Sequence, residues 1–116
     1  MLNPAIDSET TSYLPSSEKI IDGHPLQKAW VFYENSNNQF SSGIWQSEVG
    51  KWNVQFSEDE YCFILSGTSI VTDSEGNSQT VRPGDHFVIN AGFKGTWEVT
   101  ETCRKVFVAC EAVASA

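Results

Sequence analysis

Between Trp52 and Trp97 the chain reads WNVQF (52–56), EYCFILSG (60–67), RPGD (82–85) and NAGFKGTW (90–97). These runs are short, rich in β-branched and aromatic residues, and separated by turns that contain glycine. Strands of this kind, spaced by roughly 8–12 residues, are typical of β-sandwiches and small β-barrels. No long stretch places apolar residues at helical spacing. The sequence therefore predicts an all-β fold, a jelly roll or small barrel.

The same pattern predicts strands on both sides of this region. They are expected at residues 29–33, 40–46, 52–56, 60–66, 69–72, 79–81, 86–90, 96–100 and 104–111. Gly67 is expected to end one strand before the next begins, and Asp22-Gly23 to form a turn. Residues 1–19 are polar and contain two prolines, which indicates an arm that is loose or lies along a partner surface. A single barrel domain is then expected over residues 20–112, followed by a tail at 113–116.

Composition narrows the class of protein. A chain of 116 residues fits one domain with its own core. Its formal net charge of -8 argues against a nucleic acid or an anionic membrane as partner, because both are bound through clustered Lys and Arg. Three cysteines without a Cys-x-x-Cys pair predict reduced thiols in a cytoplasmic protein. We expect no secretory signal and no membrane span, because the N-terminus lacks a basic and apolar leader and no apolar stretch reaches roughly 20 residues.

The run at residues 60–66 is largely apolar on both faces of its strand. Alternation places Tyr61, Phe63 and Leu65 on one face and Glu60, Cys62 and Ile64 on the other. A strand covered on both sides borders a lumen on one face and a second layer or a second subunit on the other. We therefore expect a homodimer through the face with Tyr61, with the strand around Trp30 or the N-terminal arm exchanged between subunits.

Glu60 and Gly67 have the spacing of the glutamate and the glycine in the first cupin motif, and in this the chain resembles a cupin. In cupins two histidines precede that glutamate and bind a metal with it. Those two positions are Val54 and Phe56 here. The resemblance therefore covers the framework of the motif and not its full ligand set.

The second cupin motif is present in the same partial form. Gly84 and Gly92 keep its glycine spacing, and Asn90 stands at its proline position. Gly95 stands where the motif has a further histidine. We expect Gly95 to be either a corner of the chain or a place where a ligand approaches the backbone closely.

Five shorter stretches point to one group of cupins. They are Gly43-Ile44-Trp45, Glu60-Tyr61-Cys62, Pro83-Gly84-Asp85, residues 92–99 and Arg104-Lys105. In these stretches the chain resembles the small single-domain cupins related to the cupin domain of ureidoglycine aminohydrolase, over about residues 43–108. The resemblance implies an RmlC-like jelly roll, also described as a double-stranded β-helix. It does not select a reaction, because cupins host many.

The resemblance also implies a metal site that this chain keeps only in part. Of the four ligand positions only Glu60 has a ligating side chain, whereas divalent metals in such sites take three or four ligands. We expect no metal and no other cofactor. A metal site would need His86, Glu60 and another carboxylate to converge in the lumen.

Without a metal, the carboxylate of Glu60 needs another partner in an apolar lumen. In one arrangement it pairs with Lys105, with Lys94 as the next candidate. In the other, Lys105 faces solvent and Glu60 accepts hydrogen bonds from the backbone or a tyrosine. The sequence slightly favours the second arrangement, and both stay open.

Cys62 and four aromatic residues complete the candidate site, in which Glu60, Lys105 and Cys62 are the candidate catalytic residues. Cys62 is either a nucleophile or redox thiol with Glu60 as base, or a small buried apolar residue. No histidine is expected beside it, which favours the second interpretation. The candidates to bind a flat ligand are Trp45, Trp52, Phe56 and Trp97, although such residues often only fill a small core.

Three functions fit these features. The first is a metal-free barrel that binds a small molecule in its lumen, with or without catalysis on a small polar metabolite. The second is a metal-dependent hydrolase or isomerase like ureidoglycine aminohydrolase, which the missing ligands disfavour. The third is a non-catalytic dimeric scaffold or sensory module, which a lumen filled by Trp52, Phe56 and Trp97 would favour.

Overall fold

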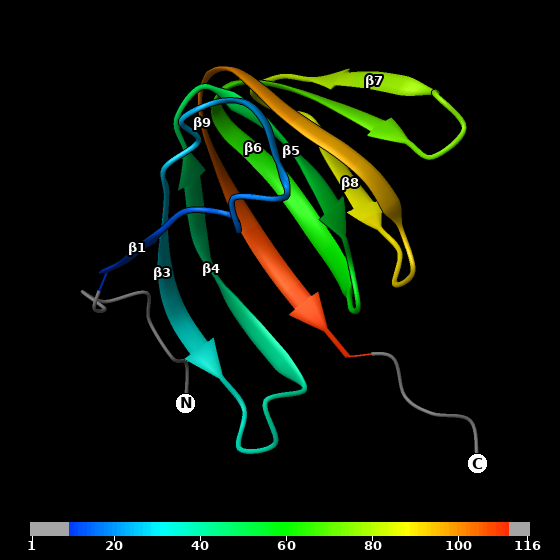
Figure 1. Ribbon diagram of the computed structural model, residues 1–116. Helices are drawn as coiled ribbons and strands as arrows, with labels where there is room; N and C mark the ends of the chain where they lie inside the picture. Colours follow the sequence, from blue (N-terminus) through cyan, green and yellow to red (C-terminus); the bar gives the residue numbers. More distant parts are fainter. Residues whose placement is uncertain (1–9, 112–116) are drawn as a thin grey trace.

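The computed structural model describes residues 10–111, and within that range the chain forms nine β-strands and no helix (Figure 1). The strands are β1 (Thr10–Tyr13), β2 (Ile20–Gly23), β3 (Gln27–Glu34), β4 (Phe40–Ser47), β5 (Gly50–Gln55), β6 (Asp59–Asp73), β7 (Ser78–Val81), β8 (His86–Ile89) and β9 (Lys94–Cys110). The all-β class is confirmed. No helix in this range is long and apolar enough to cross a membrane.

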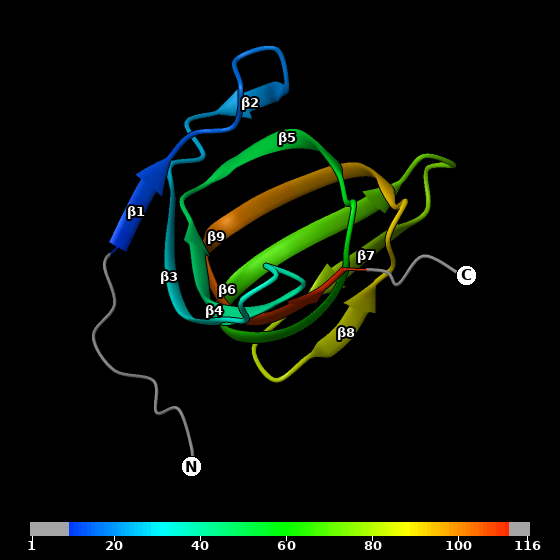
Figure 2. The same cartoon turned by 90° about the horizontal axis from the view of Figure 1, so that it is seen from below.

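Two long strands carry the architecture. β6 and β9 pair antiparallel along their whole lengths, from Asp59 opposite Cys110 to Asp73 opposite Gly95. The first half of β6 and the second half of β9 are flanked by β8 on one side and by β4, β3 and β1 on the other. Their other halves are flanked by β7 and by β5 and β2. One sheet therefore curls into two facing layers that enclose a lumen, the jelly-roll arrangement of a cupin (Figure 2).

The curl depends on a bend at Gly67. The pairing of β6 with β9 shifts register three times between Ile64 and Ser69, and Gly67 has φ +79° in the middle of these shifts. A Cβ built on Gly67 would overlap the carbonyl oxygen of Thr102. The expectation that Gly67 ends a strand is wrong, because the strand bends there and continues. The two strands expected at 96–100 and 104–111 are likewise one strand, β9.

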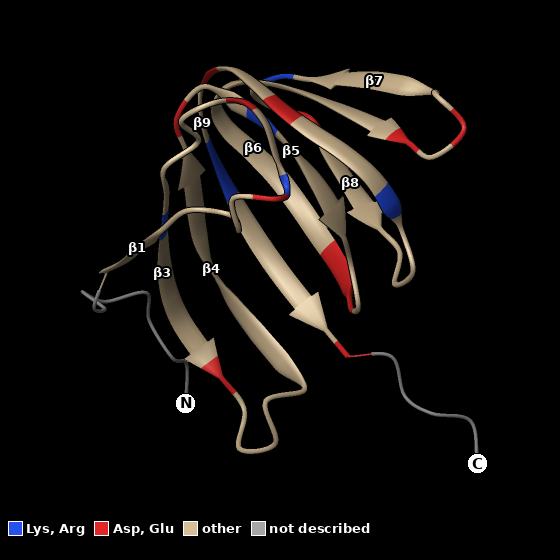
Figure 3. Ribbon diagram, in the orientation of Figure 1, with Lys and Arg blue, Asp and Glu red and all other residues tan. Residues whose placement is uncertain are grey.

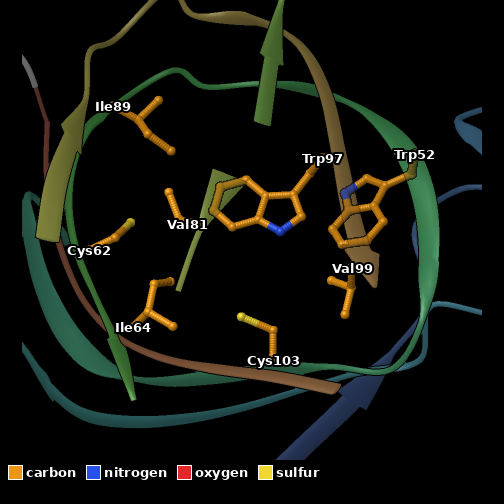
Figure 4. Close-up of a cluster of buried hydrophobic side chains, with 8 residues drawn as sticks. All are labelled: Trp52, Cys62, Ile64, Val81, Ile89, Trp97, Val99 and Cys103. Atoms are coloured by element: carbon orange, nitrogen blue, oxygen red, sulfur yellow. The ribbon is translucent and has the colours of Figure 1, made fainter. Parts of the chain in front are cut away.

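The lumen is filled at one end by an apolar core (Figure 4). Its buried members are Trp52, Cys62, Ile64, Val81, Ile89, Trp97, Val99 and Cys103. Cys62 and Ile64 are fully buried, whereas Tyr61 and Leu65 are about two fifths exposed. The alternation predicted for residues 60–66 is therefore confirmed, with Glu60, Cys62 and Ile64 on the lumen side.

Two short strands lie where the sequence predicted none. β1 lies in the expected arm and pairs with β3 of the same chain, Thr10 opposite Trp30. β2 includes Asp22-Gly23, read as a turn, and pairs with β5. Both have only four residues, too few for a readable alternation. The first nine residues of the arm and the tail at 113–116 lie outside the described residues.

Charged residues lie mostly in turns and at the ends of strands (Figure 3). This distribution leaves the lumen apolar, as the hydration of charged groups requires. Lys105 departs from this distribution, because it lies within β9 and is 4% exposed, and Glu60 on β6 also faces the lumen. The candidate site is built around these two residues.

Candidate functional site

Lys105 and Glu60 form a buried ion pair on the lumen side of the barrel. The Nζ of Lys105 donates to Oε2 of Glu60 at 2.8 Å, and the two side chains are 5% and 17% exposed. Of the two arrangements left open by the sequence, the Glu60–Lys105 pair is the one observed, and the arrangement with Lys105 in solvent is wrong. The physical reason is that a buried ammonium needs a counter-charge within contact distance. Lys94, the other candidate, is exposed.

The register of β6 and β9 brings the two charges together. Lys105 lies opposite Ile64, and Glu60 lies opposite Ala109, so both side chains point to the lumen from neighbouring strands. The ammonium also lies 4.3 Å from the ring centroid of Trp97 and 4.7 Å from that of Trp45. Aromatic faces attract cations, so the two indoles hold the charge in addition to Glu60.

The pair keeps Lys105 protonated. Burial by itself would lower the pKa of Lys105, but attraction by Glu60, together with the hydrogen bonds to Glu60 and Cys62, raises that pKa above its ordinary value. The ammonium is therefore a fixed hydrogen-bond donor at neutral pH. It is not a neutral amine that could act as a nucleophile or base.

The thiol of Cys62 belongs to the same cluster. Its Sγ donates to Oε2 of Glu60 at 3.1 Å and accepts from Nζ of Lys105 at 3.5 Å. Burial raises the pKa of Cys62 to about 12, with the attraction of Lys105 acting in the opposite direction. The thiol therefore stays protonated at neutral pH, which favours the interpretation of Cys62 as a buried residue over that of a nucleophile.

A pocket of about 240 Å³ opens above the ion pair. All four aromatic residues predicted to bind a ligand line it, and they are Trp45, Trp52, Phe56 and Trp97. Glu60 and Lys105 line it as well. The lumen is thus not filled solid by indole and phenyl rings, which is the feature that would favour a pure scaffold.

Four further pocket residues were not predicted from the sequence, Tyr13, Gln27, Ala29 and Phe107, and the first two carry polar groups. Gln27 is 5% exposed, and its Oε1 accepts a hydrogen bond from Nε1 of Trp45 at 3.0 Å. Alternation from Ala29 would have placed Gln27 on the lumen side. Nothing in the polar sequence around Tyr13 indicates that it lines the pocket. It reaches the pocket because β1 pairs with the edge of β3, and burial raises its pKa.

The residues at the cupin ligand positions do not fit a metal. Gly95 lies inside β9, and a Cβ built on it would overlap the carbonyl oxygen of Thr72, so close packing against β6 leaves no room for a histidine there. It is not the corner of the chain that the sequence suggested. Val54 and Phe56 offer no ligating atom, and the ammonium of Lys105 already occupies an oxygen of Glu60.

His86 does not complete a metal site either. Its ring stacks on Phe63 with centroids 6.3 Å apart, and Phe63 lies on the face of β6 opposite to Glu60. Within residues 10–111 no three His, Cys, Asp or Glu side chains converge in a way that could hold a metal ion. The convergence of His86 and Glu60 considered above is therefore wrong.

Comparison with known proteins gives one family match. The family model described as EutQ-like cupin domain matches residues 34–107. That range contains Glu60 and Lys105 but not Tyr13 or Gln27. No curated protein matches the chain.

Solved structures with the same fold come from several bacteria. A Pseudomonas syringae protein of unknown function from the DUF861 family has a TM-score of 0.79 and 20% identity, over 88% of this chain and 44% of that one. The Clostridium difficile EutQ protein has a TM-score of 0.66 and 16% identity, over 76% and 64%. This chain thus spans less than two thirds of either protein. A Thermotoga maritima DUF861 family protein has 31% identity and a TM-score of 0.54, over 55% of this chain and 73% of that one.

Proposed function

The chain belongs to the EutQ-like cupin domain family, and on that basis we propose that it binds a small molecule in its lumen, over the Lys105–Glu60 pair and without a metal. The observation that carries the proposal is a buried ion pair at the floor of an open, aromatic-walled pocket. Such a pocket with a few convergent polar groups is the usual form of a small-molecule site.

Stability alone does not account for the pair. Burying two charges costs several kcal/mol per ion, and well-packed apolar residues of similar size are often as stable or more so. A barrel that only served as a scaffold would do as well with leucine and methionine at these positions. The pair therefore supports recognition of a polar ligand, with Lys105 donating to it and Glu60 accepting from it.

The same geometry defines the chemistry that the pocket offers. Lys105 is a charged donor to a developing negative charge on an oxygen, and within residues 10–111 Glu60 is the only carboxylate that lines the pocket. Cys62 does not line the pocket and holds Glu60 in place through its thiol. If the protein catalyses a reaction of the bound ligand, Lys105 and Glu60 are the polar residues that touch it. A metal-dependent hydrolase is the weaker proposal, because the ligand positions do not fit.

A pocket-filling variant tests the proposal. Ala29 lines the pocket and is not a member of the ion pair, so Ala29→Leu should occupy the space that a ligand needs. We expect metabolites that raise the melting temperature of the wild type to bind Ala29→Leu about tenfold more weakly or worse, at a similar melting temperature of the free protein. Calorimetric titration measures the affinity and a thermal unfolding scan the melting temperature. Metal analysis of the same sample tests the metal-dependent alternative.

Two results would contradict the proposal. Unchanged affinity in a folded Ala29→Leu variant would place the ligand outside the lumen. A broad metabolite set without any binder to the folded wild type would favour the scaffold function.

We further propose that two copies of the chain associate through the outer face of the sheet that contains β3, β4, β9, β6 and β8. The outer face comprises Trp30, Ile44, Tyr61, Phe63, Val88, Val106 and Val108, which follow one another in cross-strand register. These seven side chains are uncharged, although the whole chain carries -8. Arg104 and His86 lie on the same face beside them, with the guanidinium of Arg104 5.0 Å from the ring centroid of Trp30 and His86 opposite Phe63. A two-fold interface sets a surface patch against itself, so a patch without acidic side chains lets two acidic chains meet without facing like negative charges.

Val88→Lys is expected to weaken this association. Val88 is 57% exposed on β8, so the substitution should leave folding intact and place two lysines at a two-fold interface. We expect the dissociation constant of the dimer to rise by about tenfold or more, measured by sedimentation velocity. Val49→Lys, at a similarly exposed valine in the β4–β5 turn, is the matched control. A wild type that sediments as a monomer at high concentration would refute the proposal.

A further inference from the structure

We infer that the lumen pocket takes an uncharged, flat, single-ring molecule with a carbonyl group beside a ring N–H, the pattern of a cyclic amide. This inference rests on the proposed function and names the chemical class of its ligand. It follows from the size of the pocket, its walls, its unpaired hydrogen-bonding groups and its charge.

Size sets the upper limit. The pocket volume of about 240 Å³ corresponds to roughly eight water molecules at about 30 Å³ each. A ligand of that bulk is one ring with small substituents. A nucleotide, a sugar chain or a peptide would extend beyond this volume.

The walls favour a flat ring. Trp45 lies with its ring centroid 6.2 Å from that of Trp52 and 5.7 Å from that of Trp97. All three indoles line the pocket, together with Phe56. Aromatic side chains gain most from a planar partner that stacks on a face or packs against an edge.

Two buried N–H groups of pocket residues lack an acceptor among the described residues. They are Nε2 of Gln27 and Nε1 of Trp97. The amide of Gln27 cannot turn its oxygen to serve instead, because that oxygen already accepts from Trp45. Buried donors are nearly always paired in native proteins, so a ligand acceptor such as a carbonyl oxygen is expected at this site.

The charges of the pocket favour a neutral ligand. Lys105 and Glu60 cancel each other at 2.8 Å. A carboxylate on the ligand would add a second negative charge beside Glu60, and an ammonium would add a second positive charge beside Lys105. Either would be unfavourable in a poorly solvated pocket.

Glu60 adds the requirement for a donor. Its Oε2 accepts from both Lys105 and Cys62, whereas Oε1 has no hydrogen-bond partner among residues 10–111. A ring N–H next to a carbonyl can supply that bond while the carbonyl oxygen accepts from Gln27 or Trp97. A cyclic amide carries both groups side by side on a flat ring.

Gln27 is the residue that tests the acceptor requirement. In Gln27→Glu the oxygen that accepts from Trp45 can remain, while the donating Nε2 is replaced by an accepting oxygen. The variant therefore keeps nearly the same shape and reverses the hydrogen-bond requirement. Gln79→Glu, at an exposed glutamine on β7, is the control for the added charge.

The experiment measures binding of 2-pyridone, benzoate, benzylamine and toluene to the purified full chain by tryptophan fluorescence and calorimetry. We expect 2-pyridone to bind most tightly, and to bind Gln27→Glu about tenfold more weakly while Gln79→Glu is unchanged. Melting temperatures establish that each variant is folded.

The other outcomes separate the inference from the proposed function. Tighter binding of benzoate or benzylamine that is lost in Ala29→Leu would overturn the cyclic amide class and leave the lumen as a binding site. Equal binding of 2-pyridone to the wild type and Gln27→Glu would overturn the role of Gln27 as the donor. Binders in the metabolite set with none among the four probes would also reject this class.

Discussion

Glu60→Gln should lower the free energy of unfolding by about 3–5 kcal/mol at pH 7, because it leaves the buried ammonium of Lys105 without a counter-charge. The hydrogen bond from Nζ can be kept by the new amide oxygen, so the loss reports the missing charge. Urea denaturation at several pH values measures it.

The double variant Glu60→Leu/Lys105→Met is the control. It removes both charges and fills the space with apolar side chains, and replacement of a whole buried pair is often neutral or stabilising. We expect its free energy of unfolding to be close to that of the wild type. A double variant as unstable as Glu60→Gln would mean that packing, and not the unpaired charge, explains the loss.

The free energy of unfolding should change with pH in different ways in the wild type and in Glu60→Gln. In the wild type the folded pKa of Lys105 is above its ordinary value of 10.5, so the stability that the protonation of Lys105 contributes is fully present below about pH 10.5 and is lost as the pH rises through the folded pKa. In Glu60→Gln burial is left to act largely alone and lowers that pKa. The unfolded chain then binds more protons than the folded one, so the variant should gain stability with pH up to about 10.5.

Gly67→Ala is expected to destabilise the fold by about 2–5 kcal/mol, the sum of a left-handed backbone and an overlap with the backbone of β9. Gly67 has φ +79°, and its missing Cβ would overlap the carbonyl oxygen of Thr102. That oxygen belongs to the paired strand and cannot move away without breaking the bend. The free energy of unfolding in urea measures the effect.

Gly76→Ala separates the two contributions. Gly76 has φ +90° in the loop between β6 and β7, and nothing lies within 4 Å of the Cβ that alanine would add. We expect this variant to lose only about 1–2 kcal/mol, the backbone contribution alone. Equal losses at Gly67 and Gly76 would show that the bend tolerates a side chain and that the close approach does not constrain it.

The sequence was informative where alternation and motif spacing reinforce each other. Residues 60–66 show both, so their lumen and outer faces were predicted correctly. The four aromatic residues of the pocket were candidates because large aromatic side chains either fill a small barrel or line its lumen. A period of two fixes the face of a strand, and the face decides which side chains can meet.

The rest depended on pairing, which local patterns do not encode. Whether Lys105 or Lys94 reaches Glu60 is decided by the register of β9 against β6, two strands far apart in the chain. A glycine such as Gly67 is expected both where a strand ends and where a strand bends. Its close approach to the carbonyl oxygen of Thr102, which shows that the strand bends and stays paired, is not visible in the local sequence. Tyr13 reaches the pocket because β1 pairs with the edge of β3 over four residues, and no alternation in the sequence predicts this pairing.

The long pairing of β6 with β9, which continues on both sides of the bend at Gly67, has a mechanical consequence for the pocket. Both layers contain part of β6 and part of β9. They therefore cannot separate without breaking the hydrogen bonds between these two strands, which form the longest pairing of the fold. Widening of the pocket therefore has to come from its edge, where Tyr13 lies on β1, a strand of only four residues that pairs with β3. A ligand that enters past Tyr13 would displace its phenol, while the ion pair on β6 and β9 stays in place.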